Sequence, residues 1–260
     1  NMIINREKAK KVFDEYVKMY DSDNEMIKLK IDHTYRVSKL CEKIAFSLGF
    51  NKNDIDIAWL LGLLHDIGRF EQVKRYGTFN DALSIDHAVL GVDILFNENK
   101  IRDFVEDDSE DQLIKKAIQF HNAYKVPEEF SKRFMDFCNL LRDADKIDIF
   151  KVNIMVPPEY VYGVSKDELY DSTITQEVME DFKKKNTVLR KLKRTAVDNL
   201  VGHISLIFGL VYNESIEIAM DMGDFQQLLE FRSKNNITNR QFEEIRELTN
   251  KYINYKIESR

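Results

Sequence analysis

The chain has 260 residues, of which 43% are hydrophobic and 32% charged, and its formal net charge is -6 at pH 7. This length and apolar content are sufficient for one large domain or two small ones with a packed core. The negative charge argues against a protein that wraps a nucleic-acid polymer through its phosphates. No apolar run approaches the roughly 20 residues that span a bilayer, so a membrane is not expected as a partner.

The cysteines and the helix breakers narrow the class of protein further. Cys41 and Cys138 are the only cysteines and lack the CxxC spacing, so no disulfide framework is expected. No signal-peptide pattern precedes the first charged helix, and a cytoplasmic location is the expectation. Nine glycines and three prolines leave few breakers, which favours long helices.

The chain opens with two amphipathic segments. Asn5 is expected to cap a helix that runs to about Tyr20, before the polar segment DSDN. A second helix is expected from Ile27 to Leu48. Its apolar face keeps helical spacing and begins with His33, which places an imidazole on the buried side.

The third predicted helix, capped by Asn53 or Asp54, ends in the stretch LLGLLHDIGR. The apolar phase of this helix continues through Asp66, so the carboxylate lies on the buried face. Burying an ionised carboxylate alone is costly, and Asp66 is therefore expected to be paired or bound to a metal. Gly68 is expected to stop the helix where His65 and Asp66 converge.

The next elements carry further residues of the ligand type. The segment 69–86 has no clean period and is expected to be a loop beside the site, where substrate contacts concentrate. His87 opens a fourth helix, and His121 ends a later one. Pro127 is expected to start a helix that carries Asp145 among apolar residues.

The second half of the chain carries fewer signals of chemistry. Segment 151–175 contains two adjacent prolines and Gly163, so a connection or cover is expected there, not a helix. A single long helix is expected from Thr187 to Tyr212, with His203 as a core or interface residue. Two more helices close the chain, the last of them capped near Thr238.

No internal repeat and no lasting strand alternation occur in the sequence. The pattern predicts an all-α protein. Residues 2–150 are expected to form a metal-binding helical domain, and residues 151–260 a helical extension that packs on it as one globular unit.

Six side chains of the ligand type fall at the ends or on the inner faces of successive predicted helices. One such histidine is more often a hydrogen-bonded core residue than a ligand, but six would each need a separate buried partner, which favours a metal. Four imidazoles and two carboxylates suit Mn, Fe, Co, Ni or Zn better than Mg²⁺ or Ca²⁺. The six are His33, His65, Asp66, His87, His121 and Asp145.

The order of these residues, with HDIGR and a distant DADK, resembles the HD superfamily of metal-dependent phosphohydrolases over about residues 27–150. The resemblance implies an HD-domain helical bundle with two divalent transition-metal ions. It implies that one ion is held by His33, His65, Asp66 and Asp145, and the other by Asp66, His87 and His121.

The branch of this superfamily that cleaves cyclic dinucleotides carries a GYP motif and a lysine in HDxGK. Here Asn122 and Ala123 follow His121, no GYP occurs, and Arg69 stands in place of the lysine, so a GYP-type member is not expected. Arginine is a planar, permanently charged fork that suits phosphate oxygens, so Arg69 keeps a phosphate-binding role.

The function that follows is hydrolysis of a nucleotide or another small phosphoester, as a phosphomonoesterase or a phosphodiesterase. Two ions about 3.5–4 Å apart lower the pKa of a shared water and neutralise charge on phosphorus. Asp66 is expected to bridge the ions, while Arg69 and Lys146 clamp phosphate oxygens. Arg75 and Tyr76 are candidates for contacts with the base or ribose.

Two other functions fit the same residues. A di-iron oxygenase would use the same ligand set with O₂, and O₂ consumption would reveal it. A nucleotide-binding regulator without chemistry would bind its ligand without turnover, although an intact ligand set argues against a protein that has lost its activity.

Overall fold

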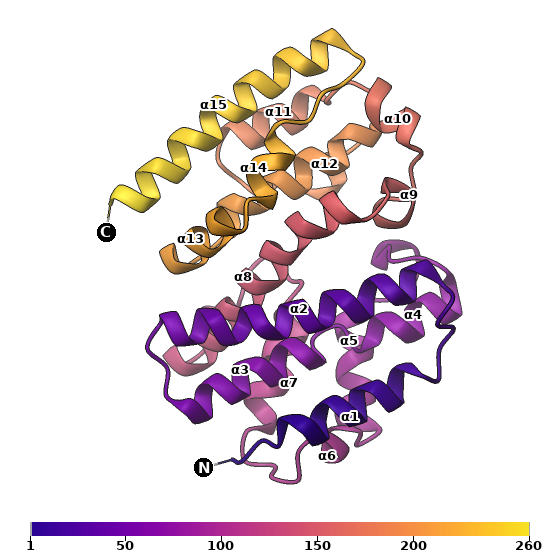
Figure 1. Ribbon diagram of the computed structural model, residues 1–260, viewed down its shortest axis with the longest axis vertical. Coiled ribbons are helices and arrows are strands. Elements are labelled where there is room, and N and C mark those ends of the chain that lie inside the picture. The colour runs from indigo at the N-terminus through magenta and orange to yellow at the C-terminus, as the bar shows by residue number, and fades with distance from the viewer. Residues whose placement is uncertain (1, 260) are drawn as a thin grey trace. The chain divides into compact units, whose positions relative to one another are not determined.

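The computed structural model describes residues 2–259, in which helices are joined by turns and loops and no strand occurs, and this confirms the all-α fold class (Figure 1). The chain divides into two compact units. The first ends at Asp145 and the second begins at Lys146, earlier than the boundary expected at residue 150. Among the described residues, no helix has the length and apolar character needed to cross a membrane.

The first unit contains seven α-helices with short 3₁₀ and π turns, and the long helix that follows them contains the boundary between the units. In chain order the elements are α1 Arg6–Val17, α2 Glu25–Ser47, α3 Lys52–Leu64, α4 Gly68–Tyr76, η1 Asp81–Leu83, α5 His87–Val92, η2 Asp93–Asn97, α6 Ile101–Phe104, α7 Asp111–Phe120 and α8 Lys132–Met155.

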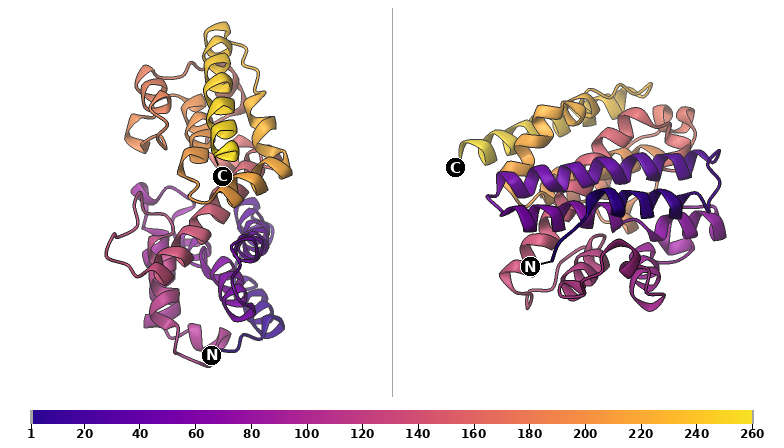
Figure 2. Two further views of the ribbon diagram at one scale, coloured as in Figure 1. Left: turned by 90° about the vertical axis from the view of Figure 1, so that its left-hand side faces the viewer. Right: turned by 60° about the horizontal axis from the view of Figure 1, so that its bottom comes forward.

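Helices α2 and α3 lie side by side and form the main contact of the first unit (Figure 2). Their close approach depends on Gly62, because a Cβ built there would lie only 2.6 Å from the Cα of Ser38. Gly62 stands one turn before His65, and Ser38 lies little more than one turn after His33. The backbone contact therefore brings the two histidine-bearing stretches together.

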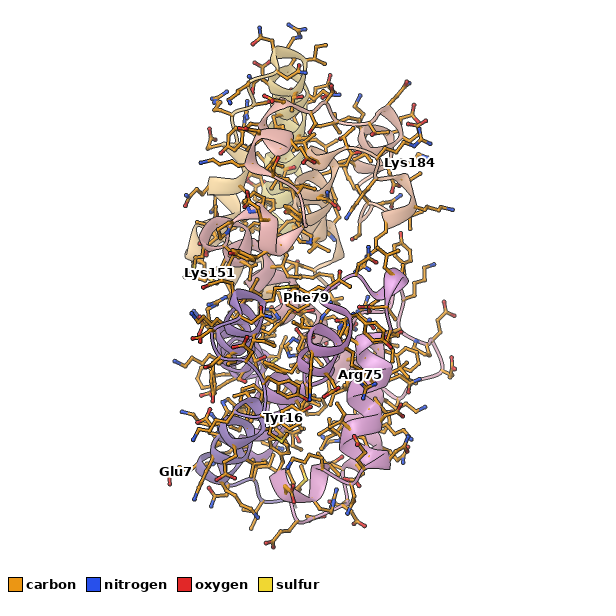
Figure 3. All side chains as sticks on the ribbon, turned by 90° about the vertical axis from the view of Figure 1, so that its right-hand side faces the viewer. Glu7, Tyr16, Arg75, Phe79, Lys151 and Lys184 are labelled. Carbon is orange, nitrogen blue, oxygen red and sulfur yellow. The ribbon has the colours of Figure 1, made fainter. Side chains whose placement is uncertain are left out.

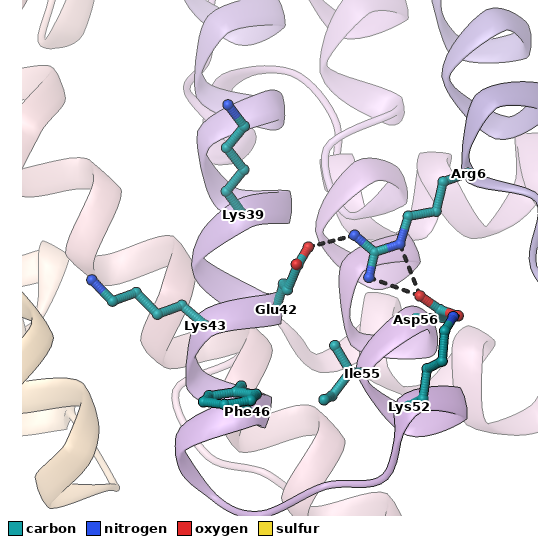
Figure 4. Close-up of a pocket in the computed structure, with 8 residues that line it drawn as sticks. All are labelled: Arg6, Lys39, Glu42, Lys43, Phe46, Lys52, Ile55 and Asp56. Atoms are coloured by element: carbon teal, nitrogen blue, oxygen red, sulfur yellow. Dashed lines mark hydrogen bonds and ion pairs between the residues drawn. The ribbon is translucent and has the colours of Figure 1, made fainter.

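Arg6 ties α1 to both of these helices. Its guanidinium forms ion pairs with Glu42 of α2 and with Asp56 of α3, the latter at 2.7 Å (Figure 4). The same guanidinium lies 5.1 Å from the ring centroid of Trp59, which favours a cation–π contact. Because one side chain serves three helices, α1 is held against the pair that carries the histidines.

The start of α3 and the start of α8 differ from the expectation. The side chain of Asn51 caps α3 by accepting from the backbone N–H of Asp54 at 2.9 Å, so neither Asn53 nor Asp54 is the cap. Pro127 does not start a helix, because the chain turns after it and α8 begins at Lys132.

The expected role of Gly68 is also wrong. Helix α3 ends at Leu64, a turn follows, and Gly68 is the first residue of α4. A Cβ on Gly68 would lie 2.2 Å from the carbonyl oxygen of His87, so glycine is required there for the approach of α5. A glycine that ends a helix and a glycine that allows two helices to approach look the same in the sequence. Only the packing distinguishes these two roles.

Segment 69–86 is not one loop, because α4 occupies its first half and is capped by Gly77, whose φ is 65°. Helical periodicity was obscured because the buried face of α4 includes the polar Gln72 beside Phe70 and Val73. A loop and the turn η1 fill the second half.

The second unit contains the rest of α8 and a series of shorter helices. They are α9 Pro158–Val161, α10 Lys166–Asp171, α11 Gln176–Lys183, η3 Arg190–Leu192, α12 Ala196–Ile204, η4 Ser205–Gly209, α13 Asn213–Met222, α14 Asp224–Leu229 and α15 Asn236–Glu258. Segment 151–175 thus holds the end of α8 and two short helices, which corrects the expected connection. Asn235, not Thr238, caps the last helix.

The single helix expected from Thr187 to Tyr212 is wrong. Its continuity is broken by a capping box, in which Thr195 and Asp198 cap each other's backbone at the start of α12. The Asp198 carboxylate also accepts from the backbone N–H of Arg194 at 2.8 Å and of Thr175 at 2.9 Å. These hydrogen bonds satisfy non-helical backbone, which apolar periodicity does not report. His203 is half-buried in this unit, 2.8 Å from the Asn153 amide.

Candidate metal centre

The six side chains of the ligand type all come from the first unit and meet at the ends or inner faces of its helices. His33 lies within α2, His65 and Asp66 occupy the turn between α3 and α4, His87 is the first residue of α5, His121 follows the last residue of α7, and Asp145 lies within α8. Five of them are buried and Asp145 is half-buried. They form two groups, in each of which all ligand atoms lie within 4.8 Å of one another.

The first group joins His33, His65, Asp66 and Asp145. The Nε2 of His33 lies 3.0 Å from the Oδ1 of Asp145 and 3.2 Å from the Nε2 of His65. The Oδ2 of Asp66 lies 3.4 Å from each of these two imidazole nitrogens. Two nitrogens and two carboxylate oxygens thus face a common point, as ligands of a divalent ion do.

The second group joins Asp66, His87 and His121. The Nε2 atoms of the two histidines are 3.0 Å apart. The other carboxylate oxygen of Asp66, Oδ1, lies 3.4 Å from His87 and 3.3 Å from His121. One oxygen of Asp66 therefore faces each group, which is the arrangement of a carboxylate that bridges two ions.

The hydrogen bonds of the Nδ1 atoms indicate which ring nitrogen of each histidine carries the proton. The Nδ1 atoms of His65 and His121 each lie 2.6 Å from a backbone carbonyl oxygen, of Gly62 and Ile118 respectively. A carbonyl only accepts, so Nδ1 donates and the neutral ring keeps its lone pair on Nε2. His87 is bound in the same way, with its Nδ1 2.7 Å from the Oδ2 of Asp81.

Lone pairs that face each other at hydrogen-bond distance repel unless a proton or a metal ion lies between them. The Nε2 pair of His87 and His121 has this character, and the donor set of nitrogen and carboxylate oxygen fits a transition-metal ion. The residues present therefore fit the metal that their types suggest.

The charges around Asp66 favour its ionised form. Burial by itself raises the pKa of the Asp66 carboxyl, but positive charge beside it, from His65 when its ring is protonated and from the ammonium of Lys30, outweighs burial and holds this pKa well below its usual value. Burial likewise raises the pKa of Asp145, and hydrogen bonds from His33 and His65, when these rings carry a proton on Nε2, lower it further than burial raises it. Both carboxylates are thus available as anionic ligands.

Lys30 is a member of the site that the sequence analysis missed. Its Nζ lies 2.9 Å from the Oδ2 of Asp66 and 5.1 Å from the ring centroid of Phe79. Lys30 precedes His33 by three residues, so both side chains lie on one face of α2. That spacing was the available signal.

The residues expected to contact substrate lie in different surroundings. Arg69 is largely buried, and its Nη1 donates to Gln72, Phe79 and Asp81. Arg75 is exposed near the end of α4 (Figure 3). It pairs with Glu71 at 2.7 Å, and the next residue, Tyr76, is exposed as well.

Lys146 belongs to the second unit. There its Cε lies 3.0 Å from the place that a Cβ of Gly209 would take.

The first unit is thus a helical bundle with two groups of histidine and aspartate side chains at its helix ends. Such a bundle is a domain built around a candidate metal centre. Residues 31–152 match the HD domain family, and this part of the chain is an HD domain. HD domains bind divalent metals, and most members of the family are metal-dependent hydrolases. No curated protein and no solved structure matches the chain.

Proposed function

We propose that this protein is a phosphohydrolase that cleaves a nucleotide or another small phosphoester at a dinuclear metal centre. The observation that supports the proposal best is that the two carboxylate oxygens of Asp66 face two separate groups of imidazole nitrogens. A single ion would leave His87 and His121 with facing lone pairs and no cation. Two ions satisfy every member of both groups.

The proposed ligands follow the two groups. His33, His65, Asp66 and Asp145 would hold one ion, and Asp66, His87 and His121 would hold the other, with Mn, Fe, Co, Ni or Zn as the candidates. When bound, such a pair of ions supplies an activated water and neutralises charge on the phosphate. The smaller group has only three protein ligands, which leaves positions for water and substrate.

Lys30 is the proposed phosphate contact of the chain itself. Its ammonium lies at the edge of the centre, and its side chain is only 13% exposed, so its charge is weakly screened. A phosphate oxygen at this place would accept a charge-assisted hydrogen bond from Nζ. The ring of Phe79 flanks the ammonium, in a contact of the cation–π type. Arg75 and Tyr76 remain candidates for the part of the substrate beyond the phosphate, and Lys146 remains a candidate second cation.

The test begins with metal-depleted protein reloaded with Mn²⁺, Fe²⁺, Co²⁺ or Ni²⁺ and supplied with a panel of nucleotides and phosphate esters. We expect release of phosphate or a nucleoside monophosphate, and we expect chelation to abolish it. His87→Ala and His121→Ala should each lose roughly one equivalent of metal and most of the activity. Asp66→Ala should lose both ions, because its carboxylate is shared.

His203→Ala is the matched control, since it removes a histidine that lies outside both groups. Its metal content should equal that of the unaltered protein. Wild-type protein that binds no metal would overturn the proposal. Consumption of O₂ without phosphate release would assign the centre to a di-iron oxygenase, and nucleotide binding without turnover would assign it to a regulator.

A further inference from the structure

We infer that Asp81 is the positioning residue for His87 at the second ion, and that Arg69 and Gln72 serve to hold Asp81 in place. This inference rests on the proposed function, because it concerns a ligand of the same centre. It gives Arg69 a role different from the phosphate contact expected from the sequence.

The contact between Asp81 and His87 involves both the ring and the backbone. The Oδ2 of Asp81 accepts from the Nδ1 of His87 at 2.7 Å and from its backbone N–H at 3.3 Å. The ring is therefore held from the side opposite to Nε2, the atom that faces Asp66 and His121. A ligand histidine that donates its other N–H to a carboxylate is fixed in tautomer and orientation and becomes more basic.

The position of His87 in its helix explains why a separate carboxylate is needed. His65 and His121 stand at the ends of α3 and α7, so each finds a carbonyl of its own preceding turn three residues earlier. His87 is the first residue of α5 and has no preceding turn in that helix. An acceptor from another segment must replace the carbonyl, and Asp81 supplies it.

Asp81 is itself held through its other oxygen. Its Oδ1 accepts from the Nη1 of Arg69 at 2.9 Å and from the Nε2 of Gln72 at 2.8 Å. Gln72 is fully buried, and its amide also reaches Ser84 at 3.0 Å. Both donors come from α4, so the loop that carries Asp81 is attached to the helix that begins beside the centre.

The guanidinium of Arg69 is already hydrogen-bonded to the residues around Asp81. Its Nη1 lies 2.8 Å from the side-chain oxygen of Gln72 and 2.8 Å from the carbonyl oxygen of Phe79. Its guanidinium lies 5.4 Å from the ring centroid of Phe79. A guanidinium held by three acceptors and an aromatic ring acts on the loop, and a substrate phosphate would have to displace those contacts.

The test is equilibrium titration of the metal-depleted full chain with Co²⁺, followed by its visible absorption, together with metal analysis. Asp81→Ala should keep the first ion and bind the second about 10–100-fold more weakly. Asp81→Asn, which keeps the shape but not the charge, should show a smaller loss. Arg69→Ala should weaken the second ion in the same direction.

Asp86→Asn is the matched control. Asp86 lies next to His87, and its substitution by asparagine removes the same negative charge as Asp81→Asn. The Asp86 side chain, however, caps α5 by accepting from the backbone N–H groups of Ala88 and Val89, a role that asparagine also performs. Its titration should equal that of the unaltered protein.

Several results would overturn the inference and leave the proposed function standing. One is an Asp81→Ala variant that binds both ions as the unaltered protein does. Another is an equal loss of both ions in Asp81→Asn, and a third is an Arg69→Ala variant with a raised KM and unchanged metal affinity. Unaltered protein that takes up no Co²⁺ would instead overturn the proposed function itself.

Discussion

At the scale of single residues, the centre is defined by which atom of each side chain carries a proton. Backbone carbonyls hold the Nδ1 protons of His65 and His121, and a carboxylate holds that of His87. The Nε2 lone pairs are thereby directed inward before any ligand binds. This is preorganisation, since the rings need no rearrangement on binding.

Lys30 provides the prediction at this scale. Lys30→Gln should lower kcat/KM by about 100-fold, because it removes a cation next to the phosphate, while leaving metal content unchanged. Steady-state kinetics and metal analysis on the same preparation measure both effects. Lys28→Gln is the control, because Lys28 lies on the same helix but is exposed and pairs with the surface residue Glu25. An unchanged kcat/KM in Lys30→Gln would contradict the proposed contact between Lys30 and the phosphate.

At the scale of elements, the centre depends on helix ends that approach closely. The turn from α3 into α4 carries His65 and Asp66, and the start of α5 lies against the start of α4. Two glycines, Gly62 and Gly68, make these approaches possible. The ligands are therefore placed by backbone packing as much as by their own side chains.

Gly68 and Gly91 offer a matched pair of substitutions at one contact. In Gly68→Ala the new Cβ would lie 2.2 Å from the His87 carbonyl oxygen, so α5 must shift. In Gly91→Ala the nearest atom is a methyl carbon of Ile67 at 3.4 Å, an ordinary contact. We expect Gly68→Ala to lose about 1–3 kcal/mol of unfolding free energy and to weaken the second ion.

Chemical denaturation and Co²⁺ titration measure the two effects. Gly91→Ala should resemble the unaltered protein in both. Equal behaviour of the two variants would show that the approach of α4 and α5 does not control the centre.

At the scale of the whole molecule, the six side chains of the ligand type draw on four helices, α2, α5, α7 and α8, and on the turn after α3. Ions held by all of them link those elements, and a ligand that binds only the folded state stabilises it by about 2.7 kcal/mol at one hundred times its dissociation constant. Chelation should therefore lower the melting temperature of the unaltered protein, as followed by helical circular dichroism.

Asp66→Ala serves as the comparison for this measurement. Because that variant should hold neither ion, its melting temperature should not respond to chelation. A shift of equal size in both proteins would show that the chelator acts elsewhere.

The sequence by itself determined the helical class, the cap at Asn5 and the start of α5 at His87, because these depend on neighbours a few residues away. It also singled out the six side chains that the structure brings into two groups. Burial leaves a strong local signal, since a polar residue in an apolar stripe stands out whatever it later contacts.

Only the tertiary structure decided which partners those residues meet. The contact of Lys30 with Asp66, the hold of Asp81 on His87 and the need for glycine at position 68 join segments that periodicity treats separately. The break before α12 likewise depends on the Asp198 carboxylate and the backbone of Thr175, far away in the chain. A polar group can satisfy its hydrogen bonds with many partners, and packing selects among them.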